Sequence, residues 1–247
     1  MPDALGWRAK IGVVVPSTNT IVQPDLECLR PEGVTNHVAR IMVPNMPIAS
    51  DEDFIALMAR VDEALYDAVD RVMTAKPDLI IVGMSSVLVW DGYNVSEARR
   101  QELERHAGVP VTGGSFALDA ALRLFGVRRL ALLSPYQPIA DQQVTRFLGE
   151  RGFEVVRFKG LKCATPLAIA EVSEDELRRH FLEIDGDEVE AIVQFGTNLS
   201  AMRLAAEAER WLGKPVLAIN PVSYWHALRQ LGINERISGR GALLASH

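Results

Sequence analysis

The sequence predicts an α/β protein of two similar lobes, each built on a parallel sheet of about four strands. Three observations support this fold class. Short apolar runs alternate with longer segments of helical period, glycines stand where those helices should end, and the whole pattern occurs twice along the chain. With 48% hydrophobic and 23% charged residues, the 247-residue chain has the composition of a globular protein with ample core.

The predicted strands are short apolar runs, as expected for strands buried on both faces of a parallel sheet. In chain order they cover residues 11–15, 37–42, 79–82, 109–111, 130–133, 154–158, 191–194 and 216–219.

The predicted helices lie between these strands. The longest, residues 51–75, places Phe54, Leu57, Val61 and Leu65 on one face, at the spacing of an amphipathic helix. Further helices are predicted over 118–125, 141–152, 175–184, 201–212 and 225–231. Glycines that favour helix ends stand at Gly33, Gly126, Gly152, Gly213 and Gly232.

The pattern repeats within the chain. Residues 10–16 (Lys-Ile-Gly-Val-Val-Val-Pro) are similar to residues 129–135 (Arg-Leu-Ala-Leu-Leu-Ser-Pro), and each segment is followed by a helix that a glycine closes. Further matches, in the same order, pair 80–85 with 192–197, 108–111 with 213–216, and 126–127 with 232–233. This order indicates an internal duplication. We therefore predict a first lobe of residues 1–112 plus 222–247 and a second lobe of residues 113–221.

Composition excludes several classes of function. The chain has 26 Lys and Arg against 32 Asp and Glu, and this net charge of −6 argues against a nucleic-acid-binding surface. The two cysteines, Cys28 and Cys163, are too few for a disulfide scaffold, which leaves one disulfide or two reduced thiols. The N-terminus lacks a signal-peptide core, and no apolar run reaches the ~18–20 residues that span a membrane. We expect a cytoplasmic protein without membrane or nucleic-acid partners.

The duplication predicts where a ligand binds. Ligands of open parallel sheets bind beyond the carboxyl ends of the strands. Two lobes related by a pseudo-two-fold axis can turn those ends towards each other, so the cleft between the lobes is the expected site. The segments that follow the strands there are 16–19, 84–86, 134–136 and 196–198.

Those segments carry uncharged hydrogen-bonding groups. Ser17 and Asn19 open a helix, where free N–H groups suit a carboxylate or phosphate, although simple N-capping explains the same pattern. Ser85 with Ser86, and Thr197 with Asn198, repeat this chemistry at the other strand ends; no dinucleotide or nucleoside triphosphate motif is present. The Tyr136 phenol could donate to a carboxylate or enolate, or serve as a half-buried loop aromatic.

Four segments resemble a known family. They are Val-Pro-Ser-Thr-Asn-Thr (15–20), Leu-Ser-Pro-Tyr (133–136), Gly-Thr-Asn-Leu (196–199) and Tyr-Trp-His-Ala-Leu-Arg (224–229). They resemble the aspartate/glutamate racemase superfamily, in the branch of maleate cis–trans isomerase and arylmalonate decarboxylase, over about 11–233. The resemblance implies two Rossmann-like lobes, a carboxylate substrate in the interlobe cleft, and neither a metal nor an organic cofactor.

The resemblance also implies roles for particular residues. Asn19 would hold a substrate carboxylate and Tyr136 would donate to it, while Ser85 and Ser86 would line an oxyanion pocket with the backbone after Gly196. The chain departs from the family at its catalytic cysteines. Met84 and Gly196 stand at the two cysteine positions, and Pro166 stands where the second-lobe asparagine is expected. A cysteine at these positions would supply a reactive thiolate, because the pKa of a cysteine thiol can approach 7.

Other groups have two interpretations each. Cys28 is expected to be a small core residue on the first helix, whereas Cys163 lies in a loop that should border the cleft. His226, Asp25, Glu27 and Asp91 are acid–base candidates or ordinary capping and surface groups.

We therefore expect a cofactor-independent isomerase or lyase that acts on a small carboxylate through an enediolate-stabilising cleft. The alternatives are a hydrolase with a cleft-bound water, and a non-catalytic dicarboxylate-binding module. The expected catalytic residues are Tyr136, Ser86 and Thr197. The expected substrate-binding residues are Ser17, Asn19, Met84, Ser85, Gly196, Asn198 and Cys163. A homo-oligomer is compatible with the resemblance, but the sequence carries no decisive interface signal.

Overall fold

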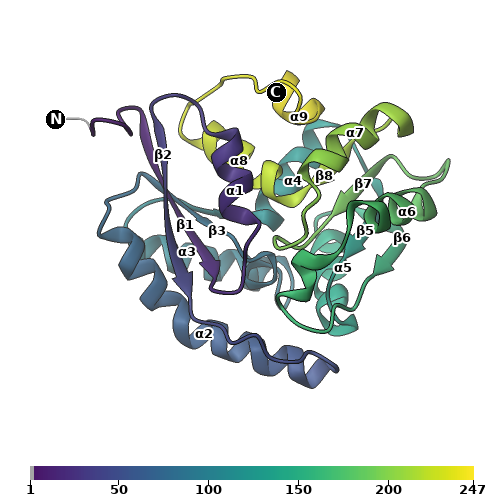
Figure 1. The fold of residues 1–247 in the computed structure, drawn as a ribbon, viewed down its shortest axis with the longest axis horizontal. Helices are drawn as coiled ribbons and strands as arrows, with labels where there is room; N and C mark the ends of the chain where they lie inside the picture. The colour runs from purple at the N-terminus through teal and green to yellow at the C-terminus, as the bar shows by residue number, and fades with distance from the viewer. Residues whose placement is uncertain (1–2) are drawn as a thin grey trace.

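A computed structural model describes residues 3–247 and contains two parallel sheets of four strands each (Figure 1). The first sheet has the order β2-β1-β3-β4, and its strands are β1 (Ala9–Pro16), β2 (Val34–Ile41), β3 (Leu79–Val82) and β4 (Val111–Gly113). The second has the equivalent order β6-β5-β7-β8, with strands β5 (Arg129–Ser134), β6 (Glu154–Gly160), β7 (Ala191–Gln194) and β8 (Val216–Ala218). The predicted fold class is confirmed.

Helices connect the parallel strands as crossovers. In the first half of the chain they are α1 (Val22–Leu29), α2 (Asp51–Met73), the 3₁₀ helix η1 (Ser85–Leu88), α3 (Tyr93–Ala107) and α4 (Gly114–Leu124). In the second half they are α5 (Pro138–Glu150), the 3₁₀ helix η2 (Ala168–Glu171), α6 (Glu174–Ile184) and α7 (Met202–Leu212), while α8 (Ile219–Gln230) and α9 (Ala242–Ser246) follow the last strand, β8.

Several boundaries differ from the prediction for identifiable reasons. The prediction has no helix at α3, because only Ser96 and Leu103 of that helix are buried and its apolar face is correspondingly weak. Helix α8 begins at Ile219, six residues before the predicted start, because a proline in the first turn of a helix is tolerated. Gly33 does not end α1, which stops at Leu29; it adopts a positive φ in the turn that leads into β2.

Helix α2 reaches from the first sheet to the second lobe. It begins with a capping box in which Ser50 and Asp53 satisfy each other's backbone N–H groups. At the same end the Asp51 carboxylate accepts the backbone N–H of Ile139, at the start of α5, at 2.9 Å. Figure 1 shows this end of α2 extending beneath the second lobe. The contact fixes the first turns of α2, including Phe54, beside the strand ends of both sheets.

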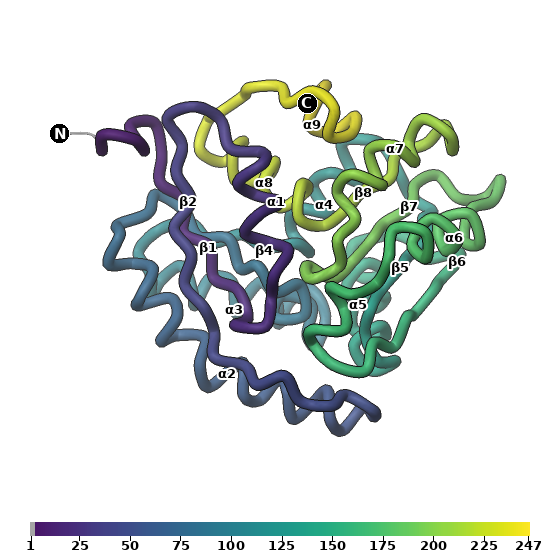
Figure 2. Tube along the Cα trace, in the orientation of Figure 1, coloured from purple at the N-terminus to yellow at the C-terminus, as the bar shows by residue number. Residues whose placement is uncertain are grey.

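Helices α4 and α8 lie between the two sheets, as the chain trace shows (Figure 2). They pack against each other, and α8 also contacts α1, β3, β4 and β8. The assignment of residues 1–112 plus 222–247 to one lobe and 113–221 to the other remains a prediction. No helix within residues 3–247 is long and apolar enough to cross a membrane.

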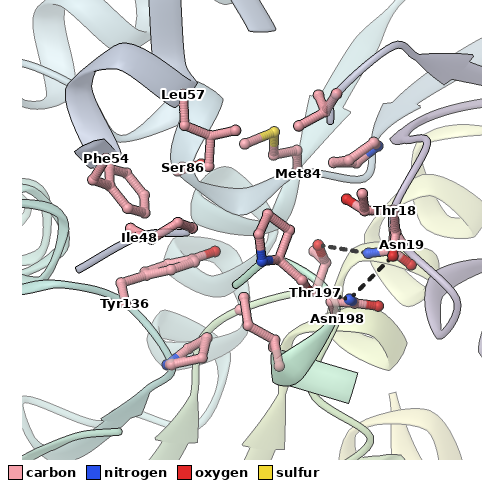
Figure 3. Close-up of a pocket in the computed structure, with 16 residues that line it drawn as sticks. Thr18, Asn19, Ile48, Phe54, Leu57, Met84, Ser86, Tyr136, Thr197 and Asn198 are labelled. Carbon is pink, nitrogen blue, oxygen red and sulfur yellow. Dashed lines mark hydrogen bonds between the residues drawn. The ribbon is translucent and has the colours of Figure 1, made fainter. Parts of the chain in front are cut away.

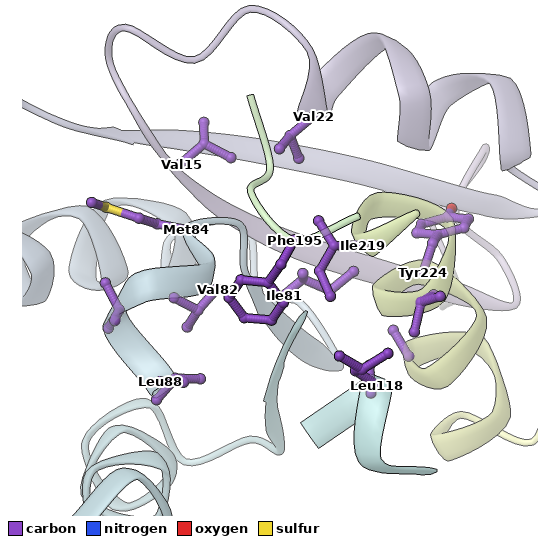
Figure 4. Close-up of a cluster of buried hydrophobic side chains, with 14 of the residues drawn as sticks. Val15, Val22, Ile81, Val82, Met84, Leu88, Leu118, Phe195, Ile219 and Tyr224 are labelled. Atoms are coloured by element: carbon purple, nitrogen blue, oxygen red, sulfur yellow. The ribbon is translucent and has the colours of Figure 1, made fainter. Parts of the chain in front are cut away.

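Phe195 anchors the end of the second sheet in a hydrophobic cluster that contains residues of both sheets. It follows β7, is 1% exposed, and belongs to the cluster that contains Ile81 and Ile219 (Figure 4). Its backbone N–H donates to the Leu133 carbonyl at 2.8 Å. The position of the segment after β7 therefore depends on packing in the other lobe.

Truncation of this anchor should destabilise the whole chain. We expect Phe195→Ala to lower the free energy of unfolding by roughly 3–5 kcal/mol, because it removes a buried ring and leaves a cavity. Denaturant unfolding followed by circular dichroism measures the effect. Phe158→Ala, at a ring that is 44% exposed, is the matched control and should change stability by less than about 1 kcal/mol. Equal losses in both variants would contradict the anchoring role.

Candidate active site

A cavity of about 50 Å³ lies at the carboxyl ends of the strands of both sheets (Figure 3). The residues that line it are Pro16, Thr18, Asn19, Val43, Ile48, Phe54, Leu57, Met84, Ser86, Pro135, Tyr136, Pro166, Ile169, Gly196, Thr197 and Asn198. None of these side chains carries a charge at neutral pH, and most of the lining consists of aliphatic and aromatic side chains from both lobes, called here the apolar wall.

Asn19 contributes both a helix cap and a cavity donor. Its side-chain oxygen accepts the backbone N–H groups of Ile21 at 3.0 Å and Val22 at 2.9 Å, so the capping interpretation holds for that atom. Its amide nitrogen donates to the Thr197 hydroxyl at 3.3 Å (Figure 3), and Thr197 donates in turn to the Gly83 carbonyl at 2.9 Å. Asn19 and Thr197 therefore join the two lobes beside the cavity.

Asn198 fastens the same junction. Its side-chain oxygen accepts the Thr20 backbone N–H at 2.9 Å, and its amide nitrogen donates to the Pro166 carbonyl at 2.9 Å. Because both polar atoms already have protein partners, Asn198 is better suited to hold the loop in place than to bind a ligand through its side chain.

Tyr136 presents the ionisable group of the lining. Its hydroxyl points into the cavity, and its ring makes edge-to-face contacts with Phe54 at 5.6 Å and Phe195 at 6.5 Å between centroids (Figure 3). Burial raises the pKa of the phenol well above its usual range. The nearby Ser85 hydroxyl group opposes this rise in pKa, although the hydroxyl groups of Ser85 and Tyr136 do not form a hydrogen bond of ordinary geometry. Tyr136 is therefore a neutral proton donor throughout the physiological pH range.

Two serine hydroxyl groups are buried without partners. The side-chain oxygens of Ser85 and Ser86 make no hydrogen bond to any residue in the described part of the chain. Burying an unpaired hydroxyl costs about 1–3 kcal/mol, so such groups are unusual in stable proteins. Ser86 lines the cavity, where a ligand oxygen would supply the missing partner.

Met84 and Gly196 both line the cavity. In the sequence, Met84 directly follows Gly83 and Gly196 directly follows Phe195. The Met84 side chain is 9% exposed and forms part of the apolar wall. Gly196 has a φ of +124°, and a Cβ atom at this position would lie 2.5 Å from Cδ of Pro135. Only glycine fits there without a shift of the loop, so the backbone can approach a ligand closely.

Some predicted residues lie elsewhere. Ser17, Ser85 and Cys163 do not line the cavity. The Ser17 hydroxyl donates to the Val43 carbonyl at 2.9 Å and accepts the Val43 N–H at 3.0 Å. Ser17 therefore forms its hydrogen bonds with the loop after β2. Cys163 packs against the core of the second lobe, and burial raises the pKa of its thiol to about 11, which disfavours the reactive thiolate.

Cys28 and His226 also lie away from the cavity. Cys28 is exposed, which contradicts the expected core position, because it lies on the outer face of the short α1. His226 is not part of the cavity lining. Its Nδ1 lies 2.8 Å from the Thr112 hydroxyl, and burial, aided by Arg100, lowers its pKa. No cluster of His, Cys, Asp and Glu suited to a metal ion is found within residues 3–247.

The sequence did not indicate the apolar wall as part of a site. Val43 and Ile48 belong to a connection with no regular period, and Ile169 lies in the short η2. Phe54 and Leu57 were assigned to the buried face of a helix, and nothing in the sequence distinguishes its cavity-lining end from the rest.

Comparisons with known proteins agree with this architecture. A family profile described as arylmalonate decarboxylase matches residues 11–244. A maleate isomerase from Pseudomonas putida is 26% identical over 96% of this chain and 97% of its own. An arylmalonate decarboxylase from Bordetella bronchiseptica is 26% identical over 69% of this chain and 72% of its own.

Solved structures share the fold. Nocardia farcinica maleate cis–trans isomerase, determined with a covalently bound succinylcysteine intermediate, superposes with a TM-score of 0.87 at 23% identity. The match covers 97% of this chain and 99% of that structure. A structure of arylmalonate decarboxylase has a TM-score of 0.73 at 22% identity, covering 95% and 98% of the two chains.

A buried carboxyl group lies behind the Tyr136 loop. Asp141, in the first turn of α5, is 6% exposed, and one of its oxygens has no hydrogen-bond partner in the described chain. Burial raises its pKa to about 7, while the Ser134 hydroxyl and Lys162 oppose the rise and Asp51 adds to it. A carboxyl group with a raised pKa favours folding in its protonated form, so its contribution is lost as the pH rises through about 7.

We therefore expect Asp141→Asn to be more stable than the wild type at pH 8, by about 2–4 kcal/mol, and similar to it at pH 4. Urea unfolding at the two pH values tests this. Asp187→Asn, at a carboxyl group outside the core, serves as the control. A gain of equal size at both pH values would show that the effect does not come from ionisation of Asp141.

Proposed function

The chain belongs to the arylmalonate decarboxylase family, and we propose that it is a cofactor-independent enzyme of the isomerase or lyase type that acts on a small carboxylate in this cavity. Its relatives are named for such reactions, and the uncharged donors at the strand ends suit the oxyanions that these reactions form.

The cavity lining favours decarboxylation among these reactions. Proton abstraction from carbon needs a general base, and cis–trans isomerisation through a covalent adduct needs a nucleophile such as a thiolate. The lining supplies no carboxylate, imidazole or thiol in the described chain, and both cysteines lie elsewhere. Loss of carbon dioxide needs neither group. It requires a place where the departing carboxylate loses hydration, donors for the developing oxyanion, and one proton donor.

The apolar side chains and the uncharged donors of the lining match these needs for a malonate-type acid. One carboxylate would lie against Val43, Leu57 and Met84, where its charge is poorly solvated, and it would leave as neutral carbon dioxide. The other would accept hydrogen bonds from the Ser86 hydroxyl and the Asn19 amide. When the carbon–carbon bond breaks, its electron pair moves into an enediolate that these donors stabilise.

Tyr136 would complete the reaction. Its phenolic proton is transferred to the enediolate carbon, and the phenolate then takes a proton from water, so that one proton is consumed for each carbon dioxide released. The raised pKa of Tyr136 keeps the phenol protonated until that moment. It does not prevent the transfer, because an enediolate carbon is a far stronger base than a phenolate. The single observation on which the proposal depends is this neutral, buried phenol, whose hydroxyl points into a cavity lined largely by apolar side chains.

A non-catalytic dicarboxylate-binding module is the second candidate, because the lining has no general base. Hydrolysis has less support, since His226, the expected activator of a water, lies outside the cavity. Turnover separates these alternatives: a binding module retains malonate-type acids without releasing carbon dioxide.

The test is incubation with carboxyl-labelled ¹³C methylmalonate and phenylmalonate, followed by NMR of the released bicarbonate. We expect wild-type turnover, and a fall in kcat of about 10²-fold or more in Tyr136→Phe, with binding retained. Tyr93→Phe removes a phenol that does not line the cavity and should keep wild-type rates. Binding without carbon dioxide release by the wild type would favour the module. Full activity in Tyr136→Phe would exclude Tyr136 as the proton donor.

A further inference from the structure

Asp25 and Asn220 lie outside the cavity but connect directly to its loops. The Asn220 amide nitrogen, in the first turn of α8, donates to the Asp25 carboxylate at 2.8 Å and to the Thr197 backbone carbonyl at 3.0 Å. Asn220 is 4% exposed. A single buried amide therefore links a carboxylate on α1 to the backbone of a cavity-lining residue.

These bonds close a ring around the junction of the lobes. Asn19 caps the start of α1 through its oxygen and donates to the Thr197 hydroxyl through its nitrogen. Asp25 lies one turn further along α1 and returns to Thr197 through Asn220. Thr197 is thus held at its hydroxyl by Asn19 and Gly83, and at its carbonyl by Asn220. Figure 3 shows the Asn19 side of this ring facing the cavity.

We propose that Asn220 and Asp25 are positioning residues, which hold the Gly196–Asn198 loop in its active arrangement through the Thr197 carbonyl. The kinetic part of this inference rests on the proposed function. Neither residue lines the cavity, so neither is expected to contact the substrate.

The charge on Asp25 should determine how strongly the Asn220 amide is fixed, and therefore how strongly it holds the Thr197 loop. A hydrogen bond to a carboxylate is about twice as strong as one to a neutral acceptor. Burial raises the pKa of Asp25 to about 6, and the Asn220 amide and Arg240 oppose the rise. Arg240, in the segment before α9, is the charged group that lowers the pKa of Asp25. The groups that face Asp25 from α8 and from the Thr197 loop are uncharged: the Asn220 amide and the Thr197 carbonyl. On α1 itself, Glu27 pairs with Arg30 and Asn36.

The hold should therefore be complete above pH 7 and weaken as Asp25 becomes protonated below pH 6. Hydrogen–deuterium exchange of the peptide covering residues 195–202, corrected for the intrinsic effect of pH, measures the loop without any ligand. We expect wild-type protection to fall about fivefold between pH 8 and pH 5. Asp25→Asn, which keeps the shape and an acceptor oxygen, should show the lower protection at both pH values.

Kinetics with methylmalonate provide the second readout. We expect Asp25→Asn to be about fivefold less active than the wild type at pH 8 and nearly equal to it at pH 5, because the ratio of the two enzymes cancels the ionisation of the substrate and of Asp141, which titrate in the same range. Asn220→Ala should lose at least as much. Glu27→Gln removes a carboxylate from the same helix and should keep both the wild-type rate and the wild-type pH profile.

The two readouts separate the two proposals. If loop exchange is independent of pH in the wild type, or unchanged in Asp25→Asn, the positioning role is wrong whatever the activity. If exchange behaves as expected but the wild type releases no carbon dioxide from any malonic acid, the proposed decarboxylation is wrong and the ring stands.

Discussion

The hydrogen bond from the Thr197 hydroxyl to the Gly83 carbonyl joins the two lobes at the point where strands β3 and β7 end. The arrangement of the cavity depends on it. Phe195 is buried in the hydrophobic cluster that both sheets share, Gly196 passes tightly against Pro135, and Thr197 is then placed between Asn19 and Gly83. A loop that belongs to the second sheet is thereby held mainly by partners from the first half of the chain. The cavity can exist only while the lobes keep this register.

The absence of charged side chains from the cavity lining determines which chemistry it can support. A carboxylate that enters exchanges water for Val43, Leu57 and Met84 on one side and for neutral donors on the other. The donors are most effective where negative charge concentrates on oxygen, and the apolar wall is least unfavourable to a group that becomes neutral. Both effects favour an enediolate with departing carbon dioxide over the starting dianion. A lining with a fixed cation would stabilise the starting dianion as well, and so lower the barrier less.

The fold could be predicted from the sequence, because it follows from local patterns that occur twice. The same duplication predicts that the strand ends meet, and Asn19, Met84, Tyr136 and Thr197, which follow those ends, line the cavity in the structure. Ile48 could not be found this way. Its position depends on contacts distant in sequence, where its carbonyl accepts the Gln137 amide at 2.7 Å and its N–H donates to the Ala164 carbonyl at 2.7 Å. The position of Cys163 also depends on contacts distant in sequence, since the loop after β6 turns that thiol towards the second-lobe core and not into the cavity lining.

The duplicated scaffold is asymmetric, and the largest difference in helix length lies in one pair of equivalent helices. Helix α2 has 23 residues, whereas α6, at the same place in the second lobe, has 11. The longer helix reaches α5 through Asp51, and its first turns give the cavity Phe54 and Leu57. The second lobe offers Pro166 and Ile169 from the loop and short helix that precede α6. A symmetric cleft would bind a malonate-type acid in two equivalent orientations. The extended α2 adds Phe54 and Leu57 to one side of the cavity only, so we expect the two carboxylates of a bound malonate-type acid to meet different surroundings.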